Sequence, residues 1–175
     1  MTLWQAWMRQ AESDFRTAER VDNPADRRTR CQALSKYQQC AEKSIKGILD
    51  KLFAAGLVAQ GSDRGHRVAR YAAVLSALPA TPGSRALLNQ LRNLFSERVL
   101  DRIDFLDSLA PAYPAPGALA SRNHEYPFQD AARNWHAPSD AHAFSVGEMK
   151  RARNCAGQLV RRLRQILDAL DLLYP

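Results

Sequence analysis

Apolar residues recur every three or four positions along most of this chain, which is typical of helices with one buried face. No stretch alternates at period two for long enough to indicate a sheet. We therefore predict an all-α fold, a five-helix up-and-down bundle that occupies residues 1–175 as a single domain. The predicted helices span about residues 2–22, 25–55, 66–78, 84–110 and 145–170.

Local signals place the ends of these helices. Thr2 and Gln5, like Ser145 and Glu148, have the spacing of a capping box, in which each side chain bonds the other's backbone N–H. Gly47 lies inside the second predicted helix, where glycine costs about 1 kcal/mol relative to alanine. We expect another helix to approach closely there.

The second predicted helix has two contrasting faces. Its polar face carries Gln39, Glu42, Lys43 and Lys46, and the four-residue spacing of Glu42 and Lys46 predicts an ion pair along the surface. The helix would thus serve as a core wall and as a polar platform. Its predicted core residues are Leu34, Tyr37, Ala41, Ile45, Ile48 and Leu52.

A segment of 34 residues, 111–144, separates the last two predicted helices and holds five of the nine prolines. Loops longer than about 12 to 15 residues inside compact domains are usually functional or disordered. Trp135 and Phe128 argue against simple disorder, because aromatic side chains normally pack on something. We expect this long Pro/aromatic loop to lie against the bundle.

The formal net charge is +7 and the isoelectric point is near 9.7, which favours acidic partners such as phosphates, nucleic acid or an acidic protein. The last helix concentrates the excess, although a solvated face that keeps the protein soluble has the same composition. Its six cations are Lys150, Arg151, Arg153, Arg161, Arg162 and Arg164.

Cysteine usage and hydropathy indicate a reducing compartment. Cys31 and Cys40 lie nine positions apart on one predicted helix, about 13 Å along its axis and too far for a disulfide. The sequence shows no secretory signal and no apolar run near 18 residues. We expect a cytoplasmic protein with no membrane contact.

Three places in the chain together resemble the HEPN domain family. They are the tryptophans and Asp14 of the first helix, the stretch from Gln38 to Lys46, and the loop sequence Tyr126-Pro127-Phe128 after Arg122. One branch of that family has Arg-Tyr-Pro in this loop. Here three residues separate Arg122 from Tyr126, which departs from that pattern.

The resemblance implies a domain that binds nucleotide or RNA and forms a homodimer. It also implies a nucleotidyltransferase-fold partner in a toxin-antitoxin type of pair. The site would lie in the groove between the second helix and the loop, where arginine contacts phosphate and tyrosine stacks on a base. The candidate binding residues are Gln39, Lys43, Lys46, His66, Arg122, His124 and Tyr126.

Two other functions stay open. The ribonuclease branch of the family has histidine four to six residues after arginine, whereas Arg122 and His124 are two apart, so we expect binding rather than catalysis. If the protein is an enzyme, it is a metal-independent endoribonuclease using Arg122 and His124. A non-catalytic dimeric module that binds only protein is the third reading. The histidine spacings match no zinc pattern, and we predict neither a metal nor a cofactor.

Overall fold

The computed structural model describes residues 1–23, 25–62, 75, 85–95, 99, 101, 103–106, 128–129, 133–137 and 144–174. The elements are α1 (Leu3–Val21), α2 (Arg27–Ala54), α4 (Arg85–Leu94), β1 (Phe128–Gln129), β2 (Trp135–His136) and α7 (Val146–Leu173). The fold is all-α, as predicted. The predicted third helix lies outside the described residues, except for Leu75, which is helical and buried.

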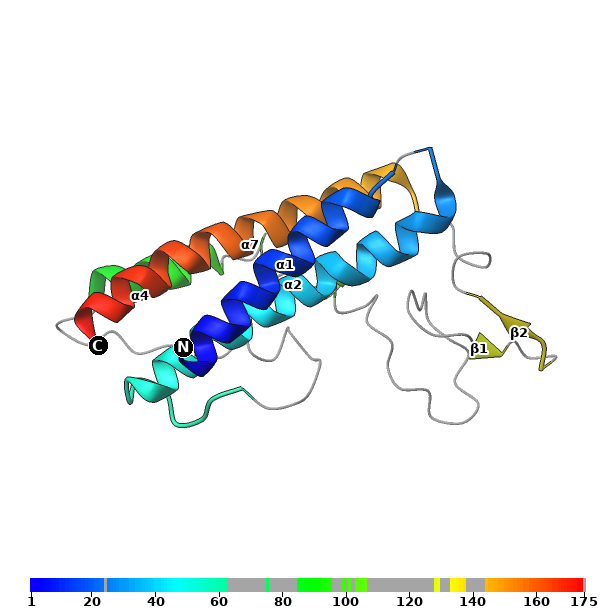
Figure 1. The fold of residues 1–175 in the computed structure, drawn as a ribbon. Helices are drawn as coiled ribbons and strands as arrows, with labels where there is room; N and C mark the ends of the chain where they lie inside the picture. The colour runs from blue at the N-terminus through cyan, green and yellow to red at the C-terminus, as the bar shows by residue number, and fades with distance from the viewer. Residues whose placement is uncertain are drawn as a thin grey trace.

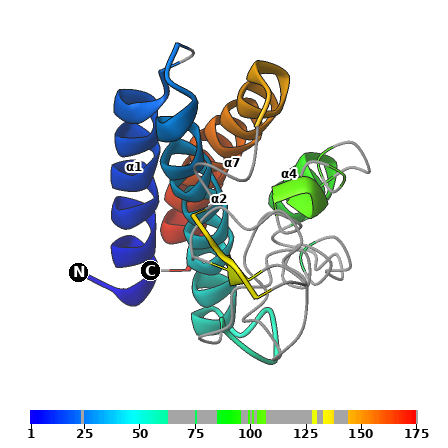
Figure 2. The same ribbon diagram turned by 90° about the vertical axis from the view of Figure 1, so that its right-hand side faces the viewer.

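The three long helices differ in direction, because α2 and α7 run parallel to each other and opposite to α1 (Figure 1). α1 runs antiparallel to α2 and α7, so that the start of α1 and the ends of α2 and α7 lie at one end of the molecule (Figure 1). α2 packs against both α1 and α7. α1 and α4 lie on opposite sides of the bundle (Figure 2), and α7 is in contact with both.

The predicted capping signals begin the first and last helices. The backbone N–H of Thr2 donates to Gln5 Oε1 at 2.9 Å. At α7 the bonds are reciprocal, because the N–H of Glu148 donates to Ser145 Oγ at 3.1 Å and the N–H of Ser145 donates to Glu148 Oε2 at 2.9 Å. The predicted helix starts are therefore confirmed.

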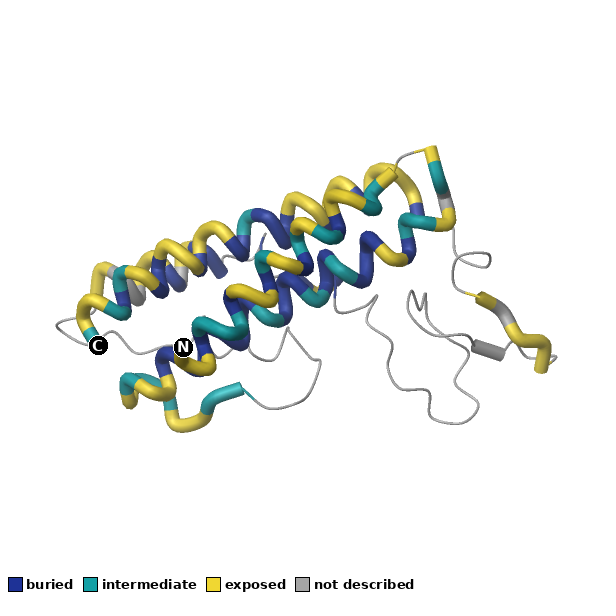
Figure 3. Tube along the Cα trace, viewed as in Figure 1, coloured by how far each residue is buried: buried dark blue, intermediate teal, exposed yellow. Residues whose placement is uncertain are grey.

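The core consists of apolar residues on the facing sides of the helices, while the outer sides are exposed (Figure 3). The predicted core residues of α2 are all buried, and α7 also buries one apolar face. On the fourth predicted helix the buried apolar residues include Leu91, Phe95, Val99, Ile103 and Leu106.

Gly47 lies at a close contact between α1 and α2. A Cβ atom built on Gly47 would lie 3.2 Å from Met8 Sδ and 3.4 Å from the carbonyl oxygen of Trp4. The predicted close helix contact is confirmed, and it explains why the smallest residue occupies a helix interior in spite of its poor propensity.

Only a few residues of the 111–144 segment are described. β1 and β2 form an antiparallel pair in which Phe128 faces His136, a ladder too short to leave a period-two signal in the sequence. Trp135 is 71% exposed, so the expectation that it packs on the bundle is wrong. Phe144 ends the segment in the core, and its carbonyl accepts from Arg30 Nη1 at 2.8 Å.

The close packing at Gly47 leads to a prediction about stability. Gly47→Val should lower the free energy of unfolding by about 1 to 3 kcal/mol, because the added methyl groups overlap Met8 and the backbone of Trp4. Urea unfolding followed by circular dichroism measures the change. The control is Gly147→Ala, where the nearest atom is Ser145 Oγ at 3.8 Å and no loss is expected. A Gly47→Val protein as stable as wild type would contradict the close packing.

Candidate functional site

Gln39 and Lys43, two of the predicted binding residues, lie in a polar cluster between α1 and α2. Its centre is Asp14, which is only 2% exposed and accepts from Lys36 Nζ at 3.3 Å and from Lys43 Nζ. Lys36 also donates to Gln39 Oε1 at 2.8 Å. The donors of this cluster are therefore engaged within the protein, with two lysines sharing one carboxylate.

Lys46 lies apart from that cluster. Its Nζ donates to Glu42 Oε1 at 2.7 Å and lies 5.3 Å from the centre of the Trp7 ring. The predicted Glu42–Lys46 pair therefore forms, but the two side chains are only 5% and 3% exposed. The expectation of a surface pair is wrong, because Trp7 of α1 packs over this turn of α2.

His66, Arg122, His124 and Tyr126 lie outside the described residues. The predicted groove between α2 and the loop therefore stays a prediction. Among the described residues, no three His, Cys, Asp or Glu side chains are grouped so that they could hold a metal ion.

Two ion pairs join α1 to α7 on the side of the bundle away from α2. Arg153 Nη2 lies 2.7 Å from Glu19 Oε1, and this hydrogen bond raises the pKa of Arg153. Arg164 Nη1 lies 3.2 Å from Glu12 Oε1. Between them Gly157 lets the Phe15 ring approach α7, since an added Cβ would lie 3.0 Å from that ring. Both glutamates on this side of α1 are thereby paired with arginines of α7, although Arg164 also pairs with Asp168 of its own helix.

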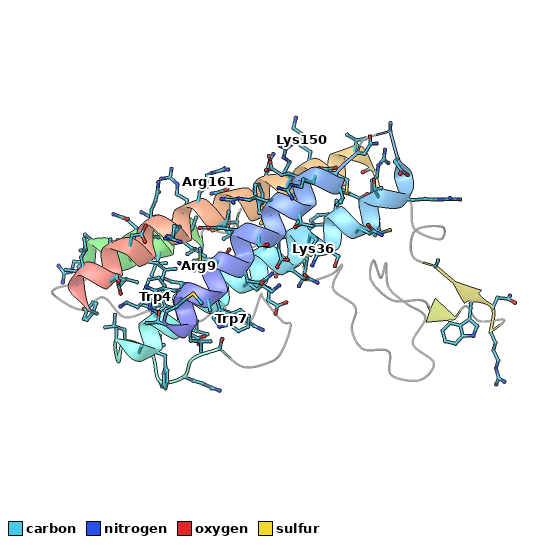
Figure 4. The ribbon with its side chains drawn as sticks, viewed as in Figure 1. Trp4, Trp7, Arg9, Lys36, Lys150 and Arg161 are labelled. Atoms are coloured by element: carbon cyan, nitrogen blue, oxygen red, sulfur yellow. The ribbon has the colours of Figure 1, made fainter. Side chains whose placement is uncertain are left out.

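A set of exposed cations surrounds these ion pairs. Arg9, Arg16 and Arg20 of α1 line a shallow hollow of about 360 Å³, and Lys150 and Arg161 project from α7 (Figure 4). None of the five forms an ion pair with another described residue. We name this set the α1–α7 face. It offers exposed positive charge that internal partners do not cancel.

The arginines of α1 were missed as site residues in the sequence, although a signal was available. Arg9, Arg16 and Arg20 are separated by seven and four positions, which places all three on one side of a helix. These arginines form a positive surface only because Glu12 and Glu19 pair with arginines of α7, and the sequence does not show that pairing.

A polar groove runs between α4 and α7. It has a volume of about 470 Å³ and contains the amides of Gln90 and Asn93 from α4 and of Gln158 and Gln165 from α7. Arg162 completes the rim, and its Nη1 donates to Gln165 Oε1 at 3.4 Å. Among the described residues that line it there is no carboxylate, and the buried apolar ones are Leu94 and Ile166.

A third hollow, of about 500 Å³, lies at the end of the bundle where α1 begins. Its buried cation is Lys51, which donates to Asp171 Oδ1 at 2.6 Å and to the carbonyl of Tyr174. Its buried acid is Asp50, which accepts from Ser62 Oγ at 2.9 Å and from Trp7 Nε1 at 2.8 Å. These groups fasten the chain ends to α2, so the hollow offers a ligand little unmet polarity.

The buried thiols and Tyr37 are not suited to reaction with a ligand. Cys31, Cys40 and Cys155 are free and buried, and burial raises the pKa of the Cys40 thiol. Burial and the carboxylate of Asp22 likewise raise the pKa of Tyr37, whose hydroxyl donates to Asp22 Oδ2 at 3.0 Å. Both groups stay uncharged at neutral pH.

Comparison with known proteins identifies a family that matches this chain. The HEPN domain family matches residues 4–113 of the chain. The crystal structure of an archaeal HEPN homologue is 19% identical over 100% of each chain, with a TM-score of 0.42. No curated protein matches. None of the described helices combines the length and the apolar character that crossing a membrane requires.

The buried position of Asp14 predicts that its charge matters for stability. Asp14→Asn should lower the free energy of unfolding by about 1 to 3 kcal/mol, because Lys36 and Lys43 lose their shared carboxylate. Urea unfolding measures this without screening the charges. Glu12→Gln, which removes an exposed pair with Arg164, should cost less than about 1 kcal/mol. Equal losses in the two variants would contradict the assignment.

Proposed function

Because this chain belongs to the HEPN domain family, we propose that it binds RNA, and that the α1–α7 face provides the contact. The observation that carries the proposal is the pairing of Glu12 and Glu19 with arginines of α7. With those acids neutralised, the exposed cations around them act on an external partner. Phosphates at regular spacing are the partner that such a surface attracts most strongly.

The residue types support the proposal. Four of the five cations on the α1–α7 face are arginines, whose planar guanidinium groups bind phosphate through two parallel hydrogen bonds. The face extends over two helices, so a bound strand could contact several cations in succession. Contacts of this kind position a backbone and carry no sequence information themselves.

The α1–α7 face is a different site from the groove on α2 that the sequence predicts, because the lysines of α2 are paired within the protein. Lys36 and Lys43 share Asp14, and Lys46 is buried beside Glu42. Lys36 lies on the opposite side of the bundle from Lys150 and Arg161 (Figure 4). We also propose that the protein forms the homodimer, and binds the nucleotidyltransferase-fold partner, that the family suggests.

Salt dependence tests the RNA proposal. Arg16→Ala and Arg161→Ala should each weaken binding of a labelled single-stranded RNA, and each should reduce the slope of log affinity against log salt by about 0.7. Fluorescence anisotropy across a salt series measures both quantities. Lys36→Ala is the matched control and should bind as wild type does. A loss confined to Lys36→Ala would move the site to α2 and refute the α1–α7 face.

We further propose that binding occurs without rapid cleavage. The arginine-to-histidine spacing of the ribonuclease branch is absent from this sequence, so no histidine is placed by that motif to take the 2′-hydroxyl proton. Labelled RNA incubated with the protein should stay intact on a denaturing gel. Cleavage that Arg122→Ala and His124→Ala both abolish, with helicity unchanged, would instead show an endoribonuclease.

A further inference from the structure

We propose that the groove between α4 and α7 holds an adenine base of a single-stranded RNA whose backbone lies on the α1–α7 face. This inference rests on the RNA binding proposed above and adds a base preference to it. It is carried by the amide side chains in the groove, by its apolar floor and by its position beside Arg161.

The amides supply the chemistry that reads adenine. Gln90 and Asn93 each carry a donor and an acceptor on one planar group, whereas Gln165 Oε1 already accepts from Arg162. Adenine presents the complementary pair at N6 and N7, and a bidentate bond from Gln or Asn is the usual way in which proteins recognise it. Guanine presents two acceptors, O6 and N7, and the group at the rim with the matching pair of donors is Arg162, which already donates to Gln165 Oε1.

The floor and the size of the groove suit a base. Leu94 and Ile166 are 8% and 5% exposed and give an apolar surface on which the face of a base can lie. The volume of about 470 Å³ lies within the range of small-molecule sites in proteins. None of the described residues that line the groove is a carboxylate, so none of them repels the attached phosphate.

Helix geometry connects the groove to the basic face. Arg161 follows Gln158 by three positions and precedes Gln165 by four, so these side chains are neighbours on the surface of α7. Arg161 therefore belongs to the α1–α7 face and borders the groove. A strand held by phosphate contacts at Arg161 could place a base into the groove. This continuity favours RNA, in which a phosphate accompanies every base, over a peptide without acidic residues.

The test compares labelled A12 and C12 RNA by fluorescence anisotropy, with wild type and a variant carrying Gln90→Ala and Asn93→Ala. Wild type should prefer A12, and the double variant should lose about tenfold in A12 affinity while C12 affinity and the salt slope stay unchanged. Gln32→Ala removes an exposed glutamine of α2 far in sequence from the groove and should behave as wild type. Circular dichroism checks that each variant is folded.

The outcomes separate this inference from the proposed function. Salt-dependent binding with equal affinity for A12 and C12 overturns the adenine site and leaves RNA binding in place. A preference for A12 that survives in the double variant also overturns it. Failure to bind either RNA overturns the proposed function and this inference together.

Discussion

Helix α2 packs against both α1 and α7, so the charged side chains in its middle and last turns have to be neutralised inside the bundle. Glu42 and Lys46 satisfy each other, whereas Lys51 is held by Asp171 and the carbonyl of Tyr174. An unpaired charge at such a position would cost several kcal/mol. The neighbouring helices supply the other partners, because Asp14 comes from α1 and Asp171 from α7.

The consequence for function is a division of charge between the inside and the outside of the bundle. Lysines of α2 form ion pairs with Asp14 and Glu42, which makes these lysines poor donors for an external ligand. The outer helices show the reverse, because α7 neutralises both glutamates on the facing side of α1. The cations that stay exposed are mostly arginines, which bind phosphate more specifically than lysines do. The proposed RNA surface is thus a by-product of how the bundle neutralises its acids.

The two proposed contact regions play different physical parts. The α1–α7 face supplies long-range attraction, which weakens as salt rises. The groove between α4 and α7 supplies short-range hydrogen bonds from neutral amides, which salt affects little. Affinity and base preference would therefore respond to different residues and different conditions. This separation is common in nucleic-acid recognition, where phosphate contacts position the strand and base contacts select it.

The sequence by itself determined the helical class, the capped starts at Thr2 and Ser145, and the core stripes, since helical periodicity and capping are local properties. Gly47 also predicted a close helix contact, because glycine is unfavourable inside a helix unless small size is needed there. Only the tertiary structure decided that Lys46 is buried and that Arg16 stays exposed. Both lie on polar stripes that look alike in sequence. Which stripe is covered depends on the residues that a distant helix brings against it, here Trp7 over one turn of α2, and periodicity carries no information about that partner.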